Sequence, residues 1–162
     1  MALDRFKEAQ SAANDGFASA MAELRSCGKR GHWIWHIFPQ LVGLGRSPTS
    51  ELYGISDIPE AEAYVRDPEL RERLLAAATA VIECLRAGRS LLVVMGAPVD
   101  VLKLVSSLTL FGAVARHLQP NAPSDDLARL TTIASEILAQ AESEGYARCA
   151  YTLRVLDNHY AR

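Results

Sequence analysis

The chain has 162 residues, of which 49% are hydrophobic and 22% charged, with a net charge of −2. This length predicts one domain with a real core, and the slightly acidic balance excludes a general nucleic-acid binder, which carries a basic excess. The longest uninterrupted apolar runs are too short to span a membrane, and the charged N-terminus is unlike a signal peptide. Three cysteines without zinc or thioredoxin spacing fit a reducing compartment, so we expect a cytoplasmic protein.

Two helices are predicted at the N-terminus. Apolar side chains recur at helical spacing over residues 3–24. The turn-forming residues Asn14-Asp15-Gly16 interrupt this pattern, which favours two helices over one. Gly28 predicts the end of the second helix, because glycine readily takes the left-handed conformation found after helices.

The next segment is apolar on nearly all sides. Residues 32–38 (HWIWHIF) fit a strand as well as a buried helix, since periodicity does not separate the two. We favour a short buried helix that ends before Pro39. Residues 40–50 are rich in glycine, serine and proline and predict a loop.

Two consecutive helices are predicted from their first residues. Asp57 and Glu60 have the spacing of a capping box, which indicates a helix to about Arg66. Asp67-Pro68 again places an N-cap before a proline, and we expect the amphipathic helix that follows to end at Gly88.

The second half of the chain is also mostly helical in pattern. Residues 91–95 predict a lone strand or an extended connector, and residues 99–118 a strongly apolar central helix. After a loop, Ser124 predicts the start of a helix to about Glu142, and a last helix should cover residues 147–160. We therefore predict a mainly α protein, a single-domain bundle (1–162) of about six to eight helices with at most one short strand.

Residues 28–40 (GKRGHWIWHIFPQ) combine two cations, two histidines and both tryptophans. Cations hold phosphate or carboxylate groups, and indole rings stack on a base or a cation, so this composition suits a planar anionic ligand. The alternative is a packed aromatic core beside solvated cations. His32 and His36 also have a spacing that can bind zinc, but the glutamate usual after the first histidine is Trp33, so we predict no metal site.

Two further segments carry polar groups with two interpretations. The loop of residues 43–47 could cradle a phosphate, or it could use glycine only to turn tightly. In the apolar helix expected over residues 99–118, polar side chains need partners if they are buried. They could line a ligand pocket, or the hydroxyls could bond carbonyls one turn earlier while Asp100 pairs with Lys103.

Three separated stretches resemble the signature of a family of small bacterial and fungal proteins, domain of unknown function number 1810, which is sometimes mislabelled calpastatin. They are GKRGHWIWHIFPQLVGLGRS (28–47), YGISDIPEAEAYVRDPELRERL (53–74) and D-x-x-K-L-x-S-S-x-T-L-F (100–111), in the same order. The resemblance implies a mainly α-helical fold and no established activity. It also implies that the polar positions beside the aromatic ones do more than pack; these are Lys29, Arg30, His32, Asp100 and Lys103.

We therefore predict that the protein binds, and could also hydrolyse, a small phosphorylated or nucleotide-like metabolite in a basic, tryptophan-lined pocket. The competing interpretation is a non-enzymatic protein-interaction module with an aromatic and arginine patch. The catalytic candidates are His32 as acid or base and Asp100 as the carboxylate that orients or activates water. The expected partner is a small anionic metabolite, without a cofactor, nucleic acid or membrane. The predicted ligand-binding residues are Lys29, Arg30, Trp33, Trp35, Gln40, Ser47, Lys103, Ser106, Ser107 and Thr109.

Overall fold

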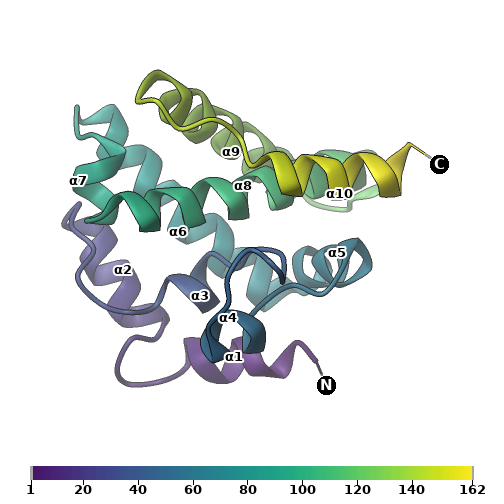
Figure 1. Cartoon of the computed structure of the whole chain (residues 1–162), viewed down its shortest axis with the longest axis horizontal. Coiled ribbons are helices and arrows are strands. Elements are labelled where there is room, and N and C mark those ends of the chain that lie inside the picture. The colour runs from purple at the N-terminus through teal and green to yellow at the C-terminus, as the bar shows by residue number, and fades with distance from the viewer. Residues whose placement is uncertain (1, 162) are drawn as a thin grey trace.

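A computed structural model describes residues 2–161, and over this range the chain forms helices and no β-sheet (Figure 1). The central helix α8 crosses the middle of the molecule, with α9 and α10 on one side and the N-terminal helices on the other. The mainly helical prediction is confirmed. The helices are α1 (Asp4–Gln10), α2 (Phe17–Arg25), α3 (Ile34–Ile37), α4 (Pro48–Leu52), α5 (Ile58–Arg66), α6 (Pro68–Arg86), α7 (Leu91–Met95), α8 (Pro98–Leu118), the short 3-10 helix η1 (Gln119–Asn121), α9 (Asp126–Ser143) and α10 (Ala150–Tyr160).

The described part of the chain has more α-helices than the six to eight predicted, because serine caps begin two short ones. Ser47 accepts a hydrogen bond from the backbone N–H of Ser50 and starts α4 inside the predicted loop. Ser90 accepts from the N–H of Val93 in the same way and starts α7. The prediction of a strand or extended connector over Leu91–Met95 was therefore wrong.

The ends of the long helices follow the predicted caps in most places. The Asp57 carboxylate accepts from the N–H of Glu60 at the start of α5, and Asp67 accepts from Leu70 at the start of α6. At α9 the prediction was wrong by one residue, because Asp125 rather than Ser124 takes the N-cap position. The left-handed residue after α2 is Cys27, with φ 57°, and not Gly28.

A disulfide joins Cys27 to Cys84 of α6, with a Cα–Cα distance of 5.7 Å. It ties the loop after α2 to α6, so two of the three cysteines are paired. The cysteine count and spacing did not predict this pair, because the two residues lie far apart in the sequence. The bond also differs from the reduced cysteines expected of a reducing compartment.

The core lies around α8 and is filled by large apolar side chains. Trp33, Phe6, Tyr64, Phe38 and Phe111 are all fully buried. By length and composition alone α8 could cross a membrane, which the short apolar runs did not suggest. However, 61% of its most apolar window is buried inside the fold, as in the core helix of a globular protein.

Candidate functional site

Residues 28–40, the basic aromatic segment, pack against the start of α8 through a row of three charged side chains, those of Lys29, Asp100 and Lys103. The Lys29 ammonium lies 2.9 Å from one carboxylate oxygen of Asp100, and the other oxygen lies 3.6 Å from the ammonium of Lys103. The Lys103 ammonium also stands 3.9 Å above the centre of the Trp35 ring, a cation–π contact. One carboxylate between two ammonium groups leaves this row with a net positive charge.

A cavity of about 510 Å³ opens beside this row. It lies between α3, the loop that precedes α4, the first turns of α8 and the segment that leads into α10. Among the residues that the structure describes, no aspartate or glutamate lines it. The lining residues are Trp35, Gln40, Leu44, Gly45, Arg46, Ser47, Val99, Leu102, Lys103, Val105, Ser106, Ala147 and Cys149.

Three polar side chains of the lining have free hydrogen-bonding capacity. Arg46 is exposed and forms no ion pair within residues 2–161. Gln40 is only 8% exposed, yet its side-chain amide has no hydrogen-bond partner among the described residues. Ser106 donates its hydroxyl proton to the carbonyl of Leu102, at 3.0 Å, so its oxygen still offers lone pairs. Together they present a cation, an amide and an acceptor to the cavity.

Several predicted site residues lie outside this cavity, where Glu23 of α2 and Asp15, just before α2, bond the backbone around them. Trp33 is fully buried, and its indole N–H donates to Glu23. Arg30 is exposed and also meets Glu23, through its backbone N–H. His32 is exposed and donates its backbone N–H to Asp15. The structure therefore places the predicted acid–base histidine at the surface rather than against the cavity.

Glu23 organises this segment and was missed in the sequence. One carboxylate oxygen accepts from the N–H groups of Arg30 and Gly31, at 2.6 and 2.7 Å, and from the indole of Trp33 at 3.1 Å. Burial works to raise the pKa of Glu23, but these donors and the nearby Lys29 ammonium outweigh it and lower that pKa. No sequence pattern could have found this role, since the partners lie in a non-helical turn beyond α2.

His36 has a structural environment. Its ring is buried, and Nε2 lies 2.6 Å from the backbone carbonyl oxygen of Asp15. Burial lowers the pKa of His36, against the pull of that carbonyl and of the Asp15 charge. Within residues 2–161 no three histidine, cysteine or acidic side chains gather in a way that could hold a metal ion.

Most of the predicted hydroxyls of α8 and of the loop before α4 form hydrogen bonds with backbone groups three or four residues away. Thr109 donates to the carbonyl of Val105 one turn earlier, and Ser47 is the cap of α4 as well as a lining residue. Ser107 is fully buried, and its hydroxyl has no hydrogen-bond partner in the described part of the chain. Thr109 and Ser107 do not line the cavity.

Ser107→Ala is expected to leave the protein as stable as the wild type or to stabilise it by about 1 kcal/mol. A buried hydroxyl without a partner keeps its desolvation cost, and alanine removes that cost with little change in volume. Urea unfolding followed by circular dichroism measures the difference. Ser106→Ala is the matched control, since it removes a bonded hydroxyl from the same helix. A loss above about 1 kcal/mol in Ser107→Ala alone would show that its hydroxyl has a partner.

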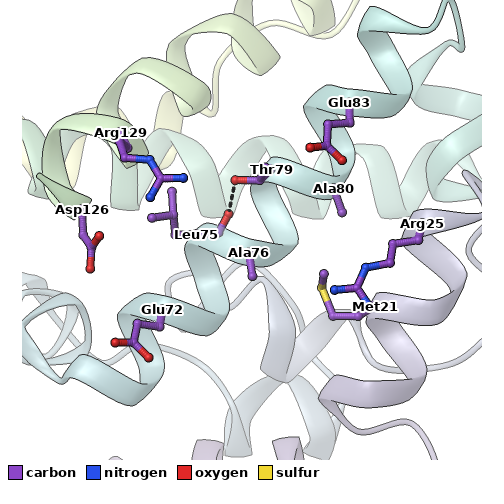
Figure 2. A pocket seen from close by; sticks show the side chains of 10 residues that line it. All are labelled: Met21, Arg25, Glu72, Leu75, Ala76, Thr79, Ala80, Glu83, Asp126 and Arg129. Atoms are coloured by element: carbon purple, nitrogen blue, oxygen red, sulfur yellow. Dashed lines mark hydrogen bonds between the residues drawn. The ribbon is translucent and has the colours of Figure 1, made fainter.

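A second hollow, of about 530 Å³, lies between α2, α6 and α9 (Figure 2). It has no aromatic lining residue and none of the residues predicted from the sequence. Arg25 and Arg129 stand on opposite sides of it, and Glu72, Glu83 and Asp126 complete its charges. This mixed lining with a slight acidic excess does not favour an anion.

Comparisons with known proteins identify a family for this chain and a crystal structure with a similar fold. The model of the family described as "Protein of unknown function (DUF1810)" matches residues 1–135. The crystal structure of the conserved hypothetical protein Rv1873 from Mycobacterium tuberculosis is similar, with 35% sequence identity, a TM-score of 0.70 and 94% of each chain covered. No curated protein matches the chain. Neither the description of the family nor that of Rv1873 names a reaction or a ligand.

Proposed function

Since the chain belongs to the DUF1810 family, whose description names no activity, we propose a function from the geometry of the site. The cavity beside Trp35 and Lys103 binds a small anionic metabolite that has a phosphate or carboxylate group and a planar part. The cytoplasm is the compartment in which we expect this ligand. The observation that carries the proposal is the lining itself, which within residues 2–161 has two cations, Arg46 and Lys103, and no acidic side chain.

Charge and hydrogen bonding both support an anion. Arg46 is unpaired within the described residues, and Lys103 shares Asp100 with a second lysine at 2.9 Å, so the cavity keeps an excess of positive charge. Arginine and lysine are the residues that proteins use most often to hold phosphate and carboxylate. The side-chain amide of Gln40, which has no hydrogen-bond partner among the described residues, is available to bond a ligand in the cavity.

Size and shape support a small molecule over a macromolecular surface. The volume falls within the range of about 300 to 1,000 Å³ that is usual for ligand sites. Trp35 is half-buried at the wall and Trp33 is fully buried, so the two indoles do not form the exposed patch of an interaction module. This arrangement favours the binding proposal over the alternative.

The geometry gives less support to hydrolysis. Neither His32 nor Asp100 lines the cavity, and Asp100 is committed to two lysines. A general base must come within hydrogen-bond reach of the proton that it removes. We therefore limit the proposal to binding.

A thermal-shift screen with inorganic pyrophosphate, nucleoside monophosphates and sugar phosphates tests the proposal. We expect at least one compound to stabilise the wild type, by about 2.7 kcal/mol at a hundredfold excess over Kd. Arg46→Gln and Lys103→Gln should each weaken the response by roughly tenfold in affinity, because each removes a charged hydrogen bond. Lys103→Gln should still fold, because Asp100 keeps Lys29 as its partner.

The matched control is Arg30→Gln, which removes an exposed arginine from the same basic segment but outside the cavity. It should respond to the ligand as the wild type does. A flat screen at millimolar concentration would contradict the proposal. An equal loss in Arg30→Gln would place the anion elsewhere on the protein.

A further inference from the structure

The third cysteine of the chain lines the same cavity. Cys149 is outside the disulfide, is half-exposed, and lies in the lining together with Ser106, Lys103 and Arg46. It lies beyond residues 1–135, so it belongs to the part of the chain that the family model does not match. Nothing in the proposed binding role uses its thiol.

Cys149 occupies the N-cap position of α10, with extended backbone angles of φ −67° and ψ 110°. The first N–H groups of a helix have no partner within the helix and point toward its N-terminus. They favour a negative charge at that position, which for cysteine means the thiolate. The helix has 11 residues, so these end groups are well formed.

A second feature lies close to this cysteine. Thr152, three residues after Cys149 in the first turn of α10, is fully buried, and its hydroxyl has no hydrogen-bond partner within residues 2–161. A buried hydroxyl with no other partner is costly, and a thiolate is an acceptor that would satisfy it.

These contacts change the acidity of the thiol. Burial works to raise the pKa of Cys149, but the hydroxyl and N–H of Thr152, the hydroxyl of Ser106 and the N–H of Tyr151 outweigh it and lower that pKa below its ordinary value. Of the two hydroxyls, that of Thr152 acts more strongly on this pKa, and the Ser106 proton already goes to the Leu102 carbonyl. The cavity therefore holds a partly exposed thiol with donors that stabilise its anion.

We propose that Cys149 is a nucleophilic thiolate that accepts a covalent adduct from small disulfides bearing carboxylates, and that this adduct closes the anion site. In the reaction the Cys149 sulfur attacks one sulfur of the disulfide and forms a new S–S bond. The original S–S bond breaks, and the other half leaves as a thiolate that takes a proton from solvent. Cys149 is oxidised and the small disulfide is reduced, so no other reactant is needed.

The preference for carboxylates rests on the proposed function, because it comes from the same cations. Lys103 and Arg46 line the cavity that an incoming disulfide must enter, and no acidic side chain lines it. Fixed charges at the walls of a cleft raise the local concentration of ligands with the opposite charge. A disulfide that carries carboxylates should therefore react faster than a neutral one of similar size.

The test compares DTNB, an aromatic disulfide with two carboxylates, with a neutral dipyridyl disulfide on the full chain purified without reductant. We expect one equivalent of thiolate to be released per chain, with the adduct mapped to Cys149 by mass spectrometry and no release from Cys149→Ser. Lys103→Gln should slow DTNB by roughly tenfold while leaving the neutral reagent nearly unchanged. The rate should rise to its plateau at a lower pH than for a cysteine in a short peptide.

Thr152→Val tests the buried hydroxyl, and Thr152→Ser is its matched control. Valine keeps the shape and removes the donor, so the rate–pH curve should move to higher pH, whereas serine should keep the wild-type curve. At neutral pH the rate should fall by about threefold for each unit by which the pKa rises, because a more basic sulfur partly offsets the loss of thiolate. Circular dichroism of both variants shows that the fold is kept.

Four outcomes separate this inference from the binding proposal. A thiol that reacts only after denaturation, or with the pH dependence of a peptide cysteine, overturns the inference even if pyrophosphate or another screened anion still binds. Equal slowing of both reagents in Lys103→Gln overturns the carboxylate preference. Loss of the wild-type ligand response after modification, with release of one equivalent, supports the link between adduct and site. A reactive Cys149 beside a flat ligand screen leaves the nucleophile in place and removes the binding proposal.

Discussion

Glu23→Ala is expected to destabilise the protein by about 2 to 3 kcal/mol, because one carboxylate oxygen serves three donors, of which the indole N–H is buried. The substitution leaves three donors without their acceptor, namely the N–H groups of Arg30 and Gly31 and the buried indole N–H of Trp33. A buried donor that loses its partner keeps its full desolvation cost. Urea unfolding of the variant and the wild type measures the difference in the free energy of unfolding.

Glu23→Gln is the matched control, because its amide oxygen can still accept while the charge is lost. The lowered pKa of Glu23 means that its contribution is present above the unfolded value of about 4.5 and is lost as the pH falls through the folded value. Wild-type stability should therefore decline on acidification more steeply than that of Glu23→Gln. The difference should be partial, since Glu60 and Asp67 also have lowered pKa values. A loss below about 1 kcal/mol in Glu23→Ala would show that water replaces the carboxylate.

The helices that the sequence predicted well are those whose start signals are local. Asp57 and Asp67 each bond an N–H three residues later, so capping, proline position and helix appear together in a short window. The same rule applies to Ser47 and Ser90, but the glycine-rich and apolar compositions around them favoured a loop and a strand. The disulfide and the Glu23 contacts depend on tertiary proximity, which no local pattern contains.

The candidate site was predicted in part from local residue types. Residue type alone indicates which side chains suit a planar anion. Five residues predicted in this way line the cavity, namely Trp35, Gln40, Ser47, Lys103 and Ser106. Sequence reasoning did not separate these residues from neighbours of the same type that are buried in the core, as Trp33 is. Arg46 entered the sequence analysis only within the loop of residues 43–47, and Cys149 only as one of three cysteines. A cavity is a gap between elements, and its lining follows from packing.

Asp100→Asn should destabilise the protein by about 3 to 5 kcal/mol, because it removes the counter-charge of a buried ammonium. The Lys29 side chain is only 6% exposed, and Asp100 is its ion-pair partner at 2.9 Å. The asparagine keeps the size of the side chain and one acceptor oxygen, which can still bond the Lys29 ammonium, so the loss reports mainly the charge. Lys103→Gln should cost much less, since Lys103 is more exposed and lies at 3.6 Å. Urea unfolding of the two variants measures both losses.

The double variant Lys29→Met/Asp100→Leu decides whether the ion pair itself or the unpaired charge sets the size of this effect. If the cost of Asp100→Asn arises from an ammonium that keeps the Gly31 carbonyl but has no counter-charge, the double variant should recover most of the lost stability, because both charges are gone and apolar side chains fill the space. If the double variant is as unstable as the single one, the pair contributes net stabilisation of its own. A loss below about 1 kcal/mol in Asp100→Asn would mean that the Lys29 ammonium reaches water and that the pair behaves as an exposed one.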